Sequence, residues 1–164
     1  MRGDWKRVVL GLLLGLALPA QGSDFGHAVV MEDSGRHTYY VAVAMGSLPA
    51  QQFLVDTGSS HSAIDSETLS KLQHSGHARY VGNLVGTMAD GSKRRVPLYR
   101  IERLVIGESC VVQDVKAAVL PGADRNILGL SVLRRLAPFS MTTSPPTLRF
   151  SGCASMTASL EGKG

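Results

Sequence analysis

An aspartate at the end of an apolar run is the clearest candidate for chemistry in this sequence. Phe53–Val55 lead directly into Asp56, which is followed by Thr57, Gly58 and Ser59. A carboxylate that ends a buried strand must be hydrogen-bonded, paired or protonated, because an isolated buried charge is very costly. The glycine can turn the backbone so that an N–H faces the carboxylate, and the two hydroxyls can orient it. We therefore predict that Asp56 is the catalytic group; the alternative is an ordinary Asx turn after a strand.

Three histidines are the candidate metal ligands. His74 and His77 have H-x-x-H spacing, and His61 is close to them in sequence. A zinc site needs three or four ligands, and the pair lies at the expected end of a helix, where histidines commonly face solvent. The sequence also contains no G-x-x-x-x-G-K-[ST], G-x-S-x-G or H-E-x-x-H motif. We therefore expect neither a metal nor an organic cofactor.

The first 22 residues have the pattern of a secretory signal peptide. Arg2, Lys6 and Arg7 precede an apolar run over residues 8–18, and small residues follow it before Ser23. This run is shorter than the about 20 residues of a spanning helix, so retention as a membrane anchor is the less favoured alternative. We expect an exported protein, periplasmic or extracellular, with one domain over 23–153 and a disordered polar tail over 154–164.

The net charge and the cysteines indicate which classes of binding partner and which redox compartment to expect. Half of the formal net charge of +4 comes from residues 1–22, so +2 remains without them. One basic cluster remains, at residues 93–95, 100 and 103, and it lacks the interleaved aromatics of a nucleic-acid site, although it could favour acidic or extended polar partners. Cys110 and Cys153 suggest one disulfide in an oxidising compartment, and two free thiols are the alternative.

The pattern of apolar runs and turns predicts a mainly β domain. Ser34–Gly35 and Asp90–Gly91 are hairpin turns, and the second hairpin is long enough to cover a site or to be an ordinary surface hairpin. Helices are expected from residue 65 for about two turns and over 130–136. The expected strands are 28–31, 38–45, 52–55, 62–64, 79–88, 93–99, 101–106, 110–112, 115–120, 138–142 and 147–150.

Taken together, these motifs resemble one subunit of a retroviral-type aspartic protease. The elements that carry the resemblance are the strand ending in Asp56–Ser59, the hairpin at Asp90–Gly91 and the apolar Ile127–Gly129 before a short helix. The chain is more closely similar to the bacterial retropepsin-like aspartyl proteases, which are exported or membrane-anchored. The resemblance runs from about Tyr39 to Phe150. It implies a retropepsin-like acid-protease half-barrel, mainly β, with one or two short helices.

The family resemblance also implies an activity and a partner. Its active site needs two D-T-G loops, and this chain has one, so the resemblance implies a symmetric homodimer in which two copies of Asp56 face each other. Two close carboxylates cannot both ionise, so they share a proton and can activate a water between them. The expected activity is that of an aspartic endopeptidase on extended peptides. The alternatives are a non-catalytic peptide-binding or assembly module of this fold, and a small β-barrel with a metal or ligand site.

The resemblance assigns roles to the residues around Asp56. Thr57 would reach across the dimer axis, Gly58 would donate its N–H to the carboxylate, and Ser59 would support the loop. Ile127, Leu128 and Gly129 would pack beneath that loop. The flap over the peptide would comprise Thr87, Met88, Ala89, Asp90 and Gly91.

One position departs from the retroviral pattern. Leu130 follows Gly129, where many retroviral enzymes have an arginine that supports the dimer. Arg125, Arg134 and Arg135 are the candidates to replace it.

Overall fold

The computed structural model describes residues 25–88, 90–120 and 122–155. The predicted signal peptide, residue 89 of the predicted flap and residues 156–164 of the predicted tail lie outside the described residues. The elements, in chain order, are β1 (His27–Val30), β2 (Glu32–Asp33), β3 (Tyr39–Met45), β4 (Gln51–Val55), β5 (Ser62–Ile64), α1 (Ser66–His74), β6 (Ala78–Thr87), β7 (Lys93–Ile106), β8 (Cys110–Val119), β9 (Asn126–Leu128), α2 (Leu130–Leu133), the 3-10 turn η1 (Arg134–Leu136), β10 (Phe139–Thr143), β11 (Pro146–Phe150) and β12 (Ala154–Ser155).

The larger sheet closes on itself as a barrel. Hydrogen-bonded neighbours run β8, β5, β9, β4, β3 and β7, and β7 pairs again with β8, while β6 extends the sheet from β7 as the second strand of a long hairpin. The pairs β4–β9 and β5–β8 are parallel. These parallel pairs bring segments distant in sequence together, and they place the end of β4 beside the end of β9.

The interior of the barrel follows the alternation of the strands. In β3, Val41, Val43 and Met45 are at most 1% exposed, while the residues between them are partly exposed, as a strand with one buried face requires. Phe53 of β4 and Leu128 of β9 join the same core. The apolar residues just before Asp56 therefore anchor its strand in the barrel interior.

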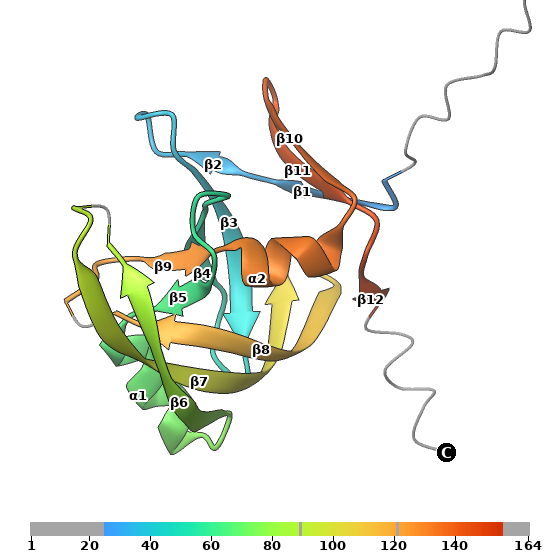
Figure 1. Ribbon diagram of the computed structural model, residues 1–164. Helices are drawn as coiled ribbons and strands as arrows, with labels where there is room; N and C mark the ends of the chain where they lie inside the picture. The colour runs from blue at the N-terminus through green and yellow to red at the C-terminus, as the bar shows by residue number, and fades with distance from the viewer. Residues whose placement is uncertain (1–24, 89, 121, 156–164) are drawn as a thin grey trace, which may run out of the picture.

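A second, three-stranded sheet lies beyond α2 in Figure 1. Its order is β1, β11 and β10, so the N-terminal strand pairs with the C-terminal hairpin. The rings of His27 and Phe150 stack at this junction, with centroids 5.4 Å apart. The helix α2 lies between this sheet and the barrel (Figure 1).

Helix α1 begins where the sequence predicts it. Asp65 is its N-cap: Oδ1 accepts a hydrogen bond from the backbone N–H of Thr68 (2.7 Å), and Oδ2 accepts one from the Thr68 hydroxyl (3.0 Å). Leu72 is fully buried and faces the barrel. Because the cap and the apolar position are both local signals, this helix could be located from the sequence.

The fold class predicted from the sequence is confirmed, with two strands longer than expected. The pairs 93–99 with 101–106, and 110–112 with 115–120, are single strands, β7 and β8. The polar residues that suggested loops have tertiary partners: Arg100 of β7 donates to the carboxylate of Asp114 in β8, and Arg135 of η1 donates to the carbonyl of Gln113 in β8. Tertiary partners thus overrode the local turn signal.

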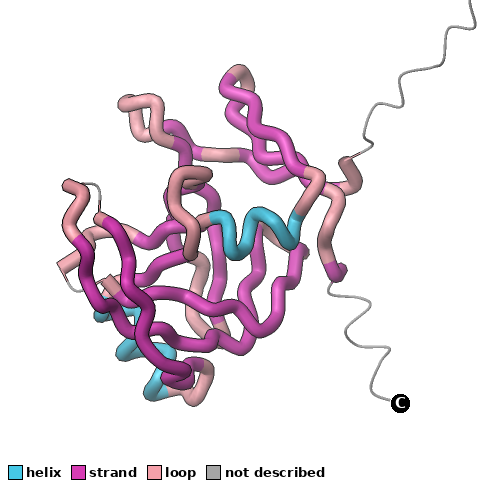
Figure 2. Tube along the Cα trace, in the orientation of Figure 1, coloured by secondary structure: helices cyan, strands magenta, loops and turns pink. Residues whose placement is uncertain are grey.

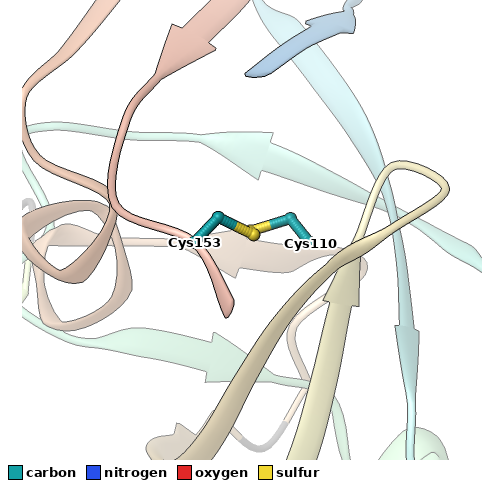
Figure 3. The surroundings of a disulfide bond; sticks show 2 residues. All are labelled: Cys110 and Cys153. Carbon is teal, nitrogen blue, oxygen red and sulfur yellow. A yellow bond between two sulfur atoms is a disulfide. The ribbon is translucent and has the colours of Figure 1, made fainter. Parts of the chain in front are cut away.

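The C-terminal strand also differs from expectation. Residues 154–155 were assigned to the disordered tail, but they form β12, which pairs with Val111 and Cys110 of β8. The predicted disulfide between Cys110 and Cys153 is confirmed and lies directly before this strand, with Cα atoms 5.5 Å apart (Figure 3). The covalent bond lies next to the pairing of β12 with the edge of β8, which local sequence could not show.

Among the described residues, no helix is both long enough and apolar enough to cross a bilayer.

Candidate active site

Asp56 lies at the first position after β4, where the chain leaves the barrel. Its backbone N–H donates a hydrogen bond of 3.1 Å to the carbonyl of Leu128, the last residue of the parallel strand β9. The preceding Val55 pairs with Leu128 in register. The backbone of the candidate catalytic residue is therefore attached to the barrel through β9.

Both carboxylate oxygens of Asp56 accept hydrogen bonds from its own loop. Oδ1 accepts from the backbone N–H of Gly58 at 2.8 Å, and Oδ2 accepts from the hydroxyl of Ser59 at 2.6 Å. Charge-assisted bonds of this length are strong and directional. They hold the plane of the carboxylate in one orientation, which is the requirement for a group that must meet a partner at fixed distance.

The loop itself is tied to the start of α2. The carbonyl of Ser59 accepts from the backbone N–H of Leu130 (2.8 Å), and the carbonyl of Ser60 accepts from that of Ser131 (3.0 Å). In Figure 2 this loop (pink) rises beside the first turn of α2 (cyan). Gly129 permits the approach, since a Cβ there would lie 2.4 Å from the carbonyl oxygen of His61 and 2.8 Å from that of Ser59.

Two serines that the sequence does not single out complete this attachment. The hydroxyl of Ser62 accepts a hydrogen bond from the backbone N–H of Gly129 (3.0 Å), and the hydroxyl of Ser131 accepts one from the backbone N–H of Ser62 (2.9 Å). Ser62 is 1% exposed and Ser131 is half-buried. The available signal was a hydroxyl next to apolar residues, Ala63 in one case and Leu130 and Val132 in the other, because a buried hydroxyl needs a partner.

The residues predicted to pack beneath the loop lie there. Ile127 and Leu128 are in β9, between β4 and β5, and Gly129 is the N-cap of α2. Leu128 is fully buried in the main core, whereas Ile127 packs against a smaller cluster with Ala63 and Val96. The apolar–apolar–glycine element thus connects the loop to both clusters.

The β6–β7 hairpin, at the left of Figure 1, carries the residues predicted as the flap. Thr87 is the last residue of β6, and Met88 exchanges backbone hydrogen bonds with Ser92 and Gly91 across the turn. Gly91 has φ +79°, which favours glycine. The hydroxyl and the backbone N–H of Ser92 both donate to Asp90 and lower the pKa of that carboxyl.

A groove of about 500 Å³ lies between the active-site loop and this hairpin. The loop contributes residues 58–61, the hairpin contributes residues 84–88 and Val96, and the barrel contributes Ala63, Ala118, Leu120 and Ile127. The floor is therefore apolar, and the loop that holds Asp56 forms one wall. A groove open along its length can accept an extended chain.

The three histidines that were candidate metal ligands make separate contacts in the fold. His61 lines the groove, the ring of His74 bonds to the carbonyl of Ser70 within α1, and the ring of His77 bonds to Glu102. Over the described parts of the chain, no three His, Cys, Asp or Glu side chains form a group that could hold a metal ion.

The arginines that could replace the missing dimer arginine differ in their contacts. Arg125 pairs with its neighbour Asp124, which raises the pKa of the guanidinium, and Arg135 bonds to the carbonyl of Gln113. Arg134 instead lines a small cavity with Ser60 and Ser131, beside the active-site loop. Of the three, Arg134 is the one next to that loop.

The comparisons with known proteins agree with this geometry. A family model described as gag-polyprotein putative aspartyl protease matches residues 41–135. The structure is similar to the crystal structure of a retropepsin-like aspartic protease from Rickettsia conorii, with a TM-score of 0.56 and 21% identity over 78% of this chain and 92% of that one. A search of curated proteins finds no match.

Proposed function

The chain belongs to the gag-polyprotein putative aspartyl protease family and has a retropepsin-like fold; from this premise we propose that it is an aspartic endopeptidase whose active site forms from Asp56 of two identical chains. The observation that carries the proposal is the orientation of the Asp56 carboxylate, whose two oxygens are each held by a loop hydrogen bond beside a groove. One such loop exists in the sequence, so a second copy must supply the other carboxylate.

The proposed reaction needs one proton shared by the two carboxylates. The ionised Asp56 takes a proton from a water between them, and the oxygen of that water bonds to the carbonyl carbon of the peptide. The protonated Asp56 donates its proton to the carbonyl oxygen, giving a tetrahedral diol. When the diol collapses, the C–N bond breaks and the amine nitrogen receives a proton from the carboxyl that took it from water. One hydroxyl of the diol returns its proton to the other carboxylate, which gives the carboxylic acid product and restores the shared proton.

The surroundings of the loop support pairing with a second copy. Thr57 is exposed, and its hydroxyl makes no hydrogen bond within the described chain, so it is available to the partner loop. Among the described strands, β10 pairs with β11 alone, which leaves one edge of the three-stranded sheet open. An open edge is a template for strand pairing between chains. Arg134, beside the same loop, is positioned to take the dimer-supporting role of the missing arginine.

We also propose that residues 1–22 direct export, so the enzyme acts in the periplasm or outside the cell. The Cys110–Cys153 disulfide supports this placement, because such bonds persist in oxidising compartments. Peptide or protein substrates are then those that share that compartment.

The test compares the wild-type protein with Asp56→Asn. Both are incubated with a library of extended peptides, and cleavage is followed by mass spectrometry while sedimentation gives the mass in solution. We expect a dimer in both cases, and cleavage reduced by about 10²- to 10⁴-fold in Asp56→Asn. A variant that folds, dimerises and cleaves at the wild-type rate would refute the proposal. A strictly monomeric wild-type protein that binds peptides without cleaving them would instead indicate a binding module.

A further inference from the structure

The β6–β7 hairpin carries a basic residue, Arg94, on the same face as the side chains that it contributes to the groove. Leu84 of β6 and Val96 of β7 are partners in the hairpin register, and both line the groove. Two positions nearer the tip, Gly86 is the partner of Arg94. Side chains two apart on a strand share a face, so Arg94 lies on the same face as Leu84 and Val96.

The geometry of Gly86 supports this assignment. A Cβ built on Gly86 would contact the side chains of Met88 (3.0 Å) and Leu84 (3.6 Å), so the direction of that Cβ is the direction of the groove. Because Gly86 has no side chain, the space opposite Arg94 on this face is open. Arg94 is therefore on a face of the hairpin that its cross-strand partner leaves unfilled.

Arg94 is not committed to another described residue. Its guanidinium makes no hydrogen bond or ion pair with the described side chains. Arg94 does interact with the carboxylate of Asp90. The pKa of Asp90 is lowered first by its hydrogen bonds with Ser92 and more weakly by the charge of Arg94. The hydrogen bonds of Asp90 are with Ser92, and the N–H groups of Arg94 form none with a described residue, so they are available to a ligand.

No described residue that lines the groove has an acidic side chain, which would repel an acidic peptide. Among the described residues that line it, His61 is the one with an ionisable side chain, and it lies on the loop wall. The other lining residues are apolar, glycine or hydroxyl residues. The residues that line the groove therefore bring no carboxylate; the nearby ones are Asp56, on the active-site loop, and Asp90, at the hairpin turn.

We propose that the groove selects peptides that carry an acidic side chain beneath the flap, and that Arg94 is the specificity-determining residue. The apolar floor of Leu84, Val96 and Ile127 accepts an apolar side chain of the same peptide. In a symmetric dimer, each of the two flaps would bring one Arg94, so acidic residues on either side of the cleaved bond would be favoured. This inference rests on the proposed function, since it describes the substrate of the same site.

The chain contains a matched control next to Arg94. Arg95 has the same charge, but it alternates with Arg94 and Val96 along β7, so its side chain lies on the other face of the hairpin from Val96. A charge reversal at residue 95 changes the net charge of the protein as much as one at residue 94. Comparing the two variants distinguishes an effect of contact with the peptide in the groove from an effect of the protein's overall charge.

The experiment uses the full chain and peptides with an apolar centre in which each flanking position in turn is Glu, Gln or Lys. Cleavage by the wild type, Arg94→Glu and Arg95→Glu is measured as kcat/KM at about 0.15 M salt, where exposed charges are screened beyond roughly 8 Å. In parallel, binding of the same peptides to Asp56→Asn, alone and combined with each charge reversal, is measured by fluorescence anisotropy.

At one or more positions the wild type should prefer Glu over Lys by about tenfold, because attraction is replaced by repulsion. Arg94→Glu should invert this ratio, and Arg95→Glu should change it by less than about threefold. Equal Glu and Lys rates in the wild type, or equal effects of the two reversals, would overturn the inference while leaving the protease intact. Peptide binding with the expected inversion, but no cleavage by any form, would support the inference and refute the proposed function.

Discussion

The hydroxyl of Ser59 donates a hydrogen bond of 2.6 Å to Oδ2 of Asp56, three residues earlier in the same loop. Together with the 2.8 Å bond from Gly58 to Oδ1, it holds a partly exposed carboxylate in one orientation without the help of any distant element. A carboxylate held in this way keeps its lone pairs aimed while remaining accessible. The first prediction follows from this pair.

Ser59→Ala should lower kcat by about 10- to 100-fold, since a hydrogen bond to a charged group contributes about 1.5–3 kcal/mol. The carboxylate would still be held by Gly58, so some activity should remain. Peptide cleavage gives kcat, and urea denaturation checks that the free energy of unfolding changes by less than about 1 kcal/mol.

Ser70→Ala is the control, because the exposed hydroxyl of Ser70, in α1, makes no hydrogen bond within the described chain; its backbone carbonyl contacts the ring of His74. It should keep kcat within about twofold. Equal losses of kcat in the two variants would show that the hydrogen bond from Ser59 to Asp56 is not the cause of the lower kcat.

Gly129→Ala should destabilise the protein by about 2–3 kcal/mol. The new Cβ would lie 2.4 Å from the carbonyl oxygen of His61, and backbone atoms cannot move aside as a side chain can. Gly26→Ala is the control, because nothing lies within 4 Å of its Cβ position. Urea denaturation of both variants measures the difference, and equal stabilities would contradict the tight packing of the loop on α2.

Replacing both Cys110 and Cys153 by Ala should lower the free energy of unfolding by about 2–4 kcal/mol. The disulfide closes a loop with a sequence separation of 43, for which the chain-entropy model gives about 4 kcal/mol. Unfolding in urea is measured with and without a reducing agent. The wild type should lose stability on reduction and the double variant should not; a wild type unaffected by complete reduction would contradict this role.

The rate of cleavage should depend on pH as a bell-shaped curve. When both copies of Asp56 are protonated, no base is available, and when both are ionised, no acid is available, so kcat/KM should fall on either side. Measuring kcat/KM from pH 3 to pH 9, with circular dichroism at each pH, separates this effect from unfolding. A rate that keeps rising into alkaline pH would exclude the shared proton.

The sequence determined the local features of this protein because their causes are local. The apolar run before Asp56, the Asp65 cap, the glycine turns and the paired cysteines each depend on neighbouring residues or on cysteine chemistry. The tertiary structure decided what depends on distant partners. It joined β7 and β8 into continuous strands and gave the hydroxyls of buried Ser62 and half-buried Ser131 their partners. It also put Arg94 on the same hairpin face as the groove-lining Val96, and Arg95 on the other face. Register and closure of the barrel set these relationships, and no short stretch of sequence contains them.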